Sequence, residues 1–123
     1  YKKNISALVS VSAFSDYRAV ARDMLSKSWL FWLFQWPLSY TISDRYSPVE
    51  SIALVSPIPL FIMQSPEDEI IEPYHAERLL DEAKPPKQLL PLYGRHNSTF
   101  RYESNRQLLL ETLQYNEALS DIE

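Results

Sequence analysis

Short apolar runs, each closed by polar residues, alternate along this chain with longer amphipathic segments. The runs occupy residues 5–11 (ISALVSV), 57–64 (PIPLFIMQ) and 89–93 (LLPLY). A short run that is apolar at nearly every position, not only at every second one, is typical of a strand buried on both faces of a parallel sheet. We therefore predict that each run is a buried strand of one parallel sheet.

Segments with helical periodicity follow the predicted strands. Apolar residues recur at spacings of three and four within residues 17–25, 74–83 and 104–119, which predicts helices with one apolar face. Ser15 or Asp16 can cap the first of these helices. Because strands and helices alternate, we expect an α/β fold of parallel strands joined by right-handed crossovers, in a single domain.

The segment of residues 28–38 (SWLFWLFQWPL) holds all three tryptophans of the chain, Trp29, Trp32 and Trp36. It is too short to span a bilayer, which takes about 20 apolar residues. Three interpretations stay open: a helix buried under a larger domain, a lid or pocket wall for an acyl-like substrate, and contact with a membrane surface.

Two prolines mark the limits of helices around this segment. Pro37 is expected to end or kink the first of them. Ser47 and Pro48 fit the start of a short helix that runs to about Leu54, because proline is favoured at the first helical position. We therefore place a helical insert or lid at about residues 26–54 of the domain.

Composition excludes several classes of site. The chain has 123 residues and a single glycine, Gly94, where average usage of about 7% would give roughly nine. Phosphate-binding loops, dinucleotide fingerprints and nucleophile elbows all need glycine, so none can form here. A net charge of −4 without a basic cluster argues against nucleic-acid binding. The absence of cysteine fits a reducing compartment, and we predict a cytoplasmic location.

The candidate chemistry comes from an acid and a histidine that follow neighbouring predicted strands. Asp68 lies in the polar turn after residues 57–64, and His96 follows residues 89–93. Because the carboxyl ends of parallel strands meet at one edge, the two side chains should lie together, in the chain order of a nucleophilic triad. Each residue alone is more often a turn former or a solvated side chain. His75 is placed on the outer face of its helix, so we expect neither a metal site nor a cofactor.

These motifs resemble the C-terminal part of the α/β-hydrolases, over about residues 5–113, and most of all the serine-peptidase-like and dienelactone-hydrolase-like branches. A family pattern like G-x-x-D-x-I-V-P appears here as SPEDEIIEP at residues 65–73, and a G-x-H segment as GRHN at residues 94–97. The resemblance implies a partial α/β-hydrolase fold with Asp68 as triad acid and His96 as base. It also implies acyl transfer on esters, thioesters or small amides.

The chain departs from that family mainly by lacking the G-x-S-x-G elbow, which would precede the strand of residues 5–11. Ser65 also replaces the usual glycine before the acid, and Arg95 stands where glycine is common. We therefore expect a chain that begins inside a longer protein, whose upstream part carries the nucleophile, and we expect the isolated chain to be inactive. The serines rejected as substitutes, because they lack flanking glycines, are Ser6, Ser10, Ser12 and Ser15.

Family strand order would pair residues 5–11 with a strand that is missing here. An uncovered apolar edge recruits another chain, so we predict a homo-oligomer formed across this edge or by burial of the Trp-rich segment. The alternative function is a non-enzymatic α/β module that binds a partner or a membrane through the Trp-rich segment, with Asp68 and His96 as turn residues. Membrane contact is the less favoured of its partners.

Overall fold

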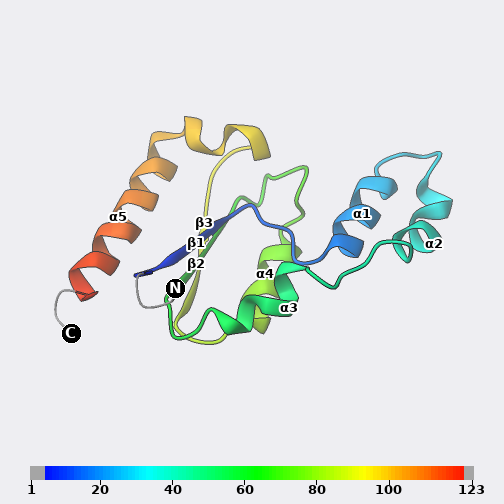
Figure 1. Ribbon diagram of the computed structural model, residues 1–123. Coiled ribbons are helices and arrows are strands. Elements are labelled where there is room, and N and C mark those ends of the chain that lie inside the picture. The colour runs from blue at the N-terminus through cyan, green and yellow to red at the C-terminus, as the bar shows by residue number, and fades with distance from the viewer. Residues whose placement is uncertain (1–4, 121–123) are drawn as a thin grey trace.

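A parallel sheet of three strands organises the molecule (Figure 1). The computed structural model describes residues 5–120, with residues 118–120 described by their backbone alone. The strands lie side by side in the order of the chain. They are β1 (Leu8–Val11), β2 (Leu60–Gln64) and β3 (Lys87–Pro91). The prediction of a parallel α/β sheet is confirmed, with β1 shorter than the apolar run that predicted it.

The central strand β2 forms the core. Leu60, Ile62 and Met63 are almost fully buried, as expected for a strand with a neighbour on each side and covered faces. Ile62 belongs to a cluster with Ala76 and Leu79 of helix α4 (Tyr74–Glu82). Helix α3 (Pro48–Ser51) and the 3₁₀ turn η3 (Ile52–Leu54) complete this side, and Ser47 and Pro48 begin α3 as predicted.

Helix α5 (Glu103–Ser120) closes the chain on the other side of the strands from α3 and α4 (Figure 1). Two buried asparagines tie it to the rest of the molecule. The Asn116 side-chain amide donates to the carbonyl of Ser6 at 2.8 Å. Asn105 bonds to the loop after β3 through both of its side-chain atoms. Each bond satisfies a backbone group that the sheet leaves unpaired, which fixes α5 against the strands.

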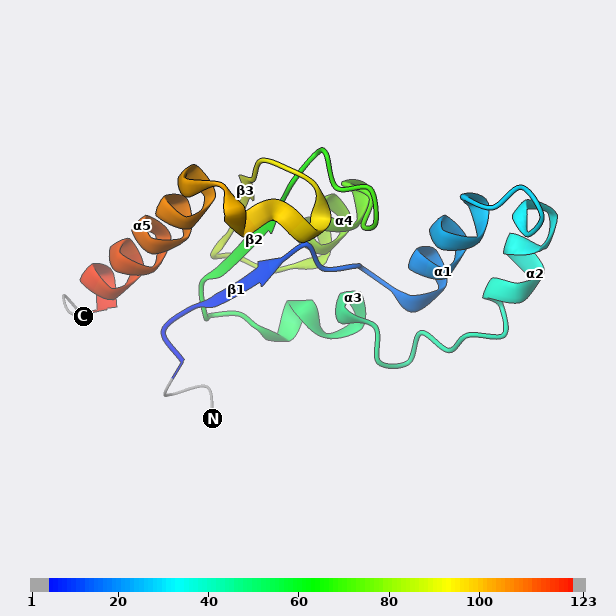
Figure 2. The same ribbon diagram turned by 90° about the horizontal axis from the view of Figure 1, so that it is seen from above.

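Helices α1 (Tyr17–Ser26) and α2 (Gln35–Ser39) project away from the sheet, joined by a turn and the 3₁₀ turn η2 (Trp32–Phe34) (Figures 1 and 2). We call residues 17–47 the aromatic arm. Asp16 caps α1 by accepting the Ala19 N–H at 2.8 Å, as one of the two predicted caps. The arm begins at α1, earlier than the predicted insert of residues 26–54, because α1 packs against α2 and η2 rather than on the strands.

One expectation for the Trp-rich segment is wrong. Pro37 lies in the first turn of α2, where an N–H has no helical partner to lose, so it neither ends nor kinks the helix. Trp29, Trp32 and Trp36 are 88%, 56% and 55% exposed, so the described residues do not bury the segment, and its burial under a larger domain stays a prediction. None of the described helices is long and apolar enough to cross a membrane.

Strand β1 stands at an edge of the sheet, with β2 as its single neighbour among the described residues. Leu8 at its start is 40% exposed. The edge that was expected to be open is therefore unpaired within residues 5–120. Pairing with a second copy along residues 5–11 stays a prediction.

Candidate active site

Asp68 is held in place by the turn that follows β2. One carboxylate oxygen, Oδ1, accepts the backbone N–H groups of Ile70 at 3.0 Å and Ile71 at 2.8 Å. The other, Oδ2, lies 3.4 Å from the side-chain amide of Gln64, the last residue of the strand. These bonds fix the rotamer of a buried acid and leave Oδ2 directed at the loop after β3.

His96 is positioned by the loop that follows β3. Gly94 has φ +91°, and a Cβ added there would clash with the Tyr102 ring, so this turn needs glycine. The buried side chain of Asn105 in α5 accepts the N–H of Tyr93 at 2.9 Å and donates to the carbonyl of Thr99 at 2.6 Å. Asn105 therefore joins the two ends of the loop that carries His96 by hydrogen bonds.

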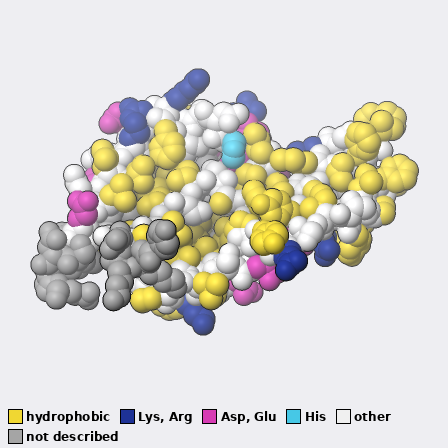
Figure 3. All heavy atoms as spheres, in the orientation of Figure 1, with side chains coloured by type: hydrophobic (Ala, Val, Ile, Leu, Met, Phe, Trp, Pro, Cys, Tyr) yellow, Lys and Arg dark blue, Asp and Glu magenta, His cyan; other side chains and the backbone are white. Residues whose placement is uncertain are grey.

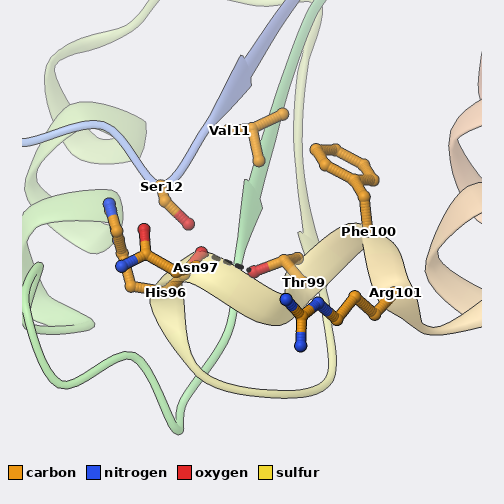
Figure 4. A pocket seen from close by; sticks show the side chains of 7 residues that line it. All are labelled: Val11, Ser12, His96, Asn97, Thr99, Phe100 and Arg101. Atoms are coloured by element: carbon orange, nitrogen blue, oxygen red, sulfur yellow. Dashed lines mark hydrogen bonds between the residues drawn. The ribbon is translucent and has the colours of Figure 1, made fainter.

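The acid and the histidine meet. His96 Nδ1 lies 2.7 Å from Asp68 Oδ2, and no other hydrogen bond joins the ring of His96 to a described residue. An ionised Asp68 accepts only, so Nδ1 carries the hydrogen and Nε2 is left as a free acceptor. His96 lines a pocket of about 540 Å³ (Figure 4). Its other lining residues are Val11, Ser12, Asn97, Thr99, Phe100 and Arg101.

The environment of Asp68 favours its ionised form. Burial raises the pKa of this carboxyl, but the N–H groups of Ile71 and Ile70, the His96 ring and the neighbouring Ser12 hydroxyl together outweigh burial. The net result is a pKa below the ordinary value of 3.8. At neutral pH Asp68 is therefore an anion, which is the state that can orient and stabilise a protonated imidazole.

The lowered pKa of Asp68 predicts a specific dependence of stability on pH. The unfolded chain takes up this proton first, so the stabilising contribution is present above the unfolded pKa and is lost as the pH falls through the folded one. We expect the difference in free energy of unfolding between the wild type and Asp68→Asn to shrink as the pH falls from about 5 to below 3.8, the ordinary pKa of an aspartate. Urea titrations at each pH measure it. A Glu67→Gln control, at an exposed neighbour, should show a flat difference, and a flat difference for Asp68→Asn would contradict the prediction.

Ser12 was rejected as a nucleophile from the sequence, but the structure places it in the pocket that His96 lines. It directly follows β1, adopts the left-handed region with φ +47°, and lines the pocket beside His96 (Figure 4). Its hydroxyl is buried and close enough to Asp68 to lower the pKa of that carboxyl, but no atom of the described residues meets it in hydrogen-bond geometry. No sequence signal marked this residue, because glycine, not serine, is the usual sign of a positive φ.

The predicted pocket residues Trp29, Trp32 and Trp36 do not join this site. None of them lines the pocket of His96, since the aromatic arm projects from the sheet (Figure 2). Glu69, an exposed neighbour of the acid, pairs with Arg95 at 3.0 Å and accepts the backbone N–H of His96 at 3.3 Å. It helps to hold the histidine loop.

A second histidine forms a buried network that the sequence did not predict. His75, placed on an outer helix face from periodicity, is fully buried, and its ring bonds to Ser15, which precedes α1, and to Asp23 within α1. Its Nδ1 accepts the N–H of Ser15 at 3.1 Å, and its Nε2 lies 2.9 Å from Asp23 Oδ2. An N–H can only donate, so Nδ1 is unprotonated and Nε2–H donates to Asp23.

The same network ties the arm to the body. Tyr74 donates its hydroxyl to Asp23 at 2.7 Å, and both burial and that carboxylate raise the pKa of Tyr74, so it stays protonated. Arg78 pairs with the cap residue Asp16 at 2.7 Å. The Ser15 hydroxyl is enclosed between Asp16 and His75 and is fully buried, so it cannot reach a substrate. We call Ser15, Asp23 and His75 the buried clasp.

Within residues 5–120, no group of three His, Cys, Asp or Glu side chains is arranged to hold a metal ion. No family model matches the chain, and no solved structure matches it. The chain is 32% identical over 100 residues to the uncharacterized protein YfhR of Escherichia coli K12, covering 80% of this chain and 32% of that protein. It is 37% identical over 84 residues to YfhR of Salmonella typhi, covering 68% and 25% respectively. The chain thus spans at most about a third of the curated relatives that it matches.

Proposed function

We propose that this chain is the C-terminal portion of an α/β-hydrolase that cleaves esters, thioesters or small amides by acyl transfer. The observation that carries the proposal is the 2.7 Å bond between Asp68 and His96, with Nε2 left free beside a pocket. Hydrogen bonds from the backbone and from His96 outweigh burial and keep the acid ionised, and two separate loops converge to form the pair. An acid whose pKa is shifted by specific partners beside a pocket is typical of a functional site.

In the proposed reaction His96 acts as general base and Asp68 as its positioning residue. Nε2 takes the proton of a serine hydroxyl as its oxygen attacks the carbonyl carbon, and then returns the proton to the leaving group. The attacking serine would come from the part of a longer protein that precedes this chain. That assignment is supported by the absence of G-x-S-x-G from the sequence and by the short share of its relatives that the chain covers.

A fluorophosphonate probe tests the proposal, because it reacts with a serine that a neighbouring base has activated. We expect the longer protein to be labelled at one serine upstream of this chain, and the isolated chain to remain unlabelled. Labelling of the isolated chain, mapped by peptide sequencing to Ser12, would show that the nucleophile had been assigned to the wrong segment. Failure to label the longer protein would contradict the hydrolase proposal itself.

A second candidate is a non-enzymatic α/β module that docks through the Trp-rich segment. The exposure of Trp29 and Trp32 favours it, since large aromatic side chains are seldom left in water without a partner. The two candidates differ in one measurement. Removal of the His96 imidazole should abolish hydrolysis under the first and leave binding unchanged under the second.

A further inference from the structure

The tip of the aromatic arm is an exposed apolar surface. Trp29 and Leu33 are the most exposed large apolar side chains of residues 28–38, which form this tip, and hydrophobic atoms gather at the projecting end of the molecule (Figure 3). Residues 28–38 offer few hydrogen-bonding side chains, namely those of Ser28, Gln35 and the tryptophans. Protein interfaces carry about one hydrogen bond per 100–200 Å². A tip this poor in polar groups is better suited to a fluid apolar layer than to a protein partner.

Charge separates the arm from the rest of the chain. Residues 17–47 hold four basic and two acidic side chains, whereas the whole chain has a net charge of −4. Arg22 lies with its guanidinium 4.5 Å from the ring centre of Trp36, and no described carboxylate pairs with it. The guanidinium of Arg45 lies 5.7 Å from the ring centre of Tyr46, and no described carboxylate pairs with it either. The arm is therefore a positive element on an acidic molecule.

The tip of the arm lies apart from the rest of the molecule. The arm projects beyond the end of the sheet at which the strands finish (Figures 1 and 2). Its links to α4 are side-chain contacts, through Asp23 to Tyr74 and His75. The tip can therefore enter a flat surface while the acidic body stays in water.

From these observations we propose that the aromatic arm docks on an anionic lipid surface. Trp29, Trp32 and Leu33 would lie at the boundary of headgroups and acyl chains, the region that tryptophan prefers. Arg22 would lie among the headgroup phosphates, which attract basic residues within a Debye length. Repulsion of the acidic body from the same surface orients the arm toward it. The proposal does not rest on hydrolase activity, so the failure of one leaves the other standing.

The chain carries its own probe for this experiment, because all three tryptophans lie in the arm. Tryptophan emission is followed as vesicles are added, either of phosphatidylcholine alone or of equal parts phosphatidylcholine and phosphatidylglycerol. We expect a blue shift and quenching by lipids brominated on the acyl chains. We also expect binding at least about five-fold tighter to the anionic vesicles, because one basic side chain near an anionic surface contributes about that factor in affinity. No blue shift with anionic vesicles, or equal binding to both kinds, would overturn the proposal.

Variants assign the effect to the arm. We expect Trp29→Ser with Leu33→Ser to weaken binding at least about ten-fold, and Arg22→Gln to weaken it about five-fold on anionic vesicles only. The matched control is Leu110→Ser with Tyr115→Ser, because these α5 side chains are also more than half exposed, and it should bind like the wild type. Circular dichroism verifies the fold of each variant. If the arm variant binds vesicles like the wild type, or changes only the oligomeric state seen by light scattering, the arm is not a lipid-docking element.

Discussion

Replacement of Asp68 by asparagine should lower kcat of the longer protein by about 10⁴-fold, with little change in KM. Asparagine can still accept the N–H groups of Ile70 and Ile71 that now bond to Oδ1, so the turn should keep its shape. Its side-chain NH₂, however, would donate to Nδ1 of His96, which moves the ring hydrogen to Nε2. A ring with hydrogen on Nε2 cannot take a proton from a serine, and the anion that stabilised the imidazolium is gone.

Steady-state hydrolysis of a chromogenic ester and the rate of fluorophosphonate labelling both measure this effect, and the two should fall together. Glu67→Gln is the matched control, since Glu67 lies in the same turn, is exposed and makes no described contact with His96. It should keep kcat within about two-fold, because surface substitutions away from such features change free energies by no more than about 0.5 kcal/mol. A loss of less than ten-fold for Asp68→Asn would show that the pair does not work as acid and base of a triad.

Replacement of His75 by alanine should cost about 3–5 kcal/mol of the free energy of unfolding, through the cavity and the unpaired groups that it leaves. The imidazole is fully buried and bonds to the Ser15 N–H and to the Asp23 carboxylate. Both would lose their partner in a place where water does not replace it. The loss is a large fraction of the 5–15 kcal/mol typical of a single domain.

Urea unfolding followed by circular dichroism measures the loss, and tryptophan emission adds a second probe that reports on the arm alone. Ser15→Ala, which keeps the backbone N–H, should cost only about 1 kcal/mol. Glu82→Ala, at an exposed position on the same helix, should stay within about 0.5 kcal/mol of the wild type. If His75→Ala also stays within about 1 kcal/mol, the clasp is an incidental contact and not a support of the fold.

Local patterns were sufficient for most of the architecture. Runs of apolar residues too short for helices predicted the strands, and Asp16 and Pro48 marked helix starts by side-chain chemistry that acts over a few residues. The meeting of Asp68 with His96 also followed from the sequence, because both residues come after strands that proved to be neighbours. Strand order was the one non-local assumption in that prediction.

The sequence by itself determined the parallel sheet and the two loops at its edge that carry an acid and a histidine. Tertiary structure alone decided where the other polar side chains went. His75 lies on a helix face that periodicity assigns to water, and it is buried because Ser15 and Asp23, from a segment far earlier in the chain, cover it. The Trp-rich segment has the composition of a core, yet no described element packs over its tip. Burial of a helix face depends on which distant segment packs on it, and the local hydrophobic pattern of the sequence does not specify that segment.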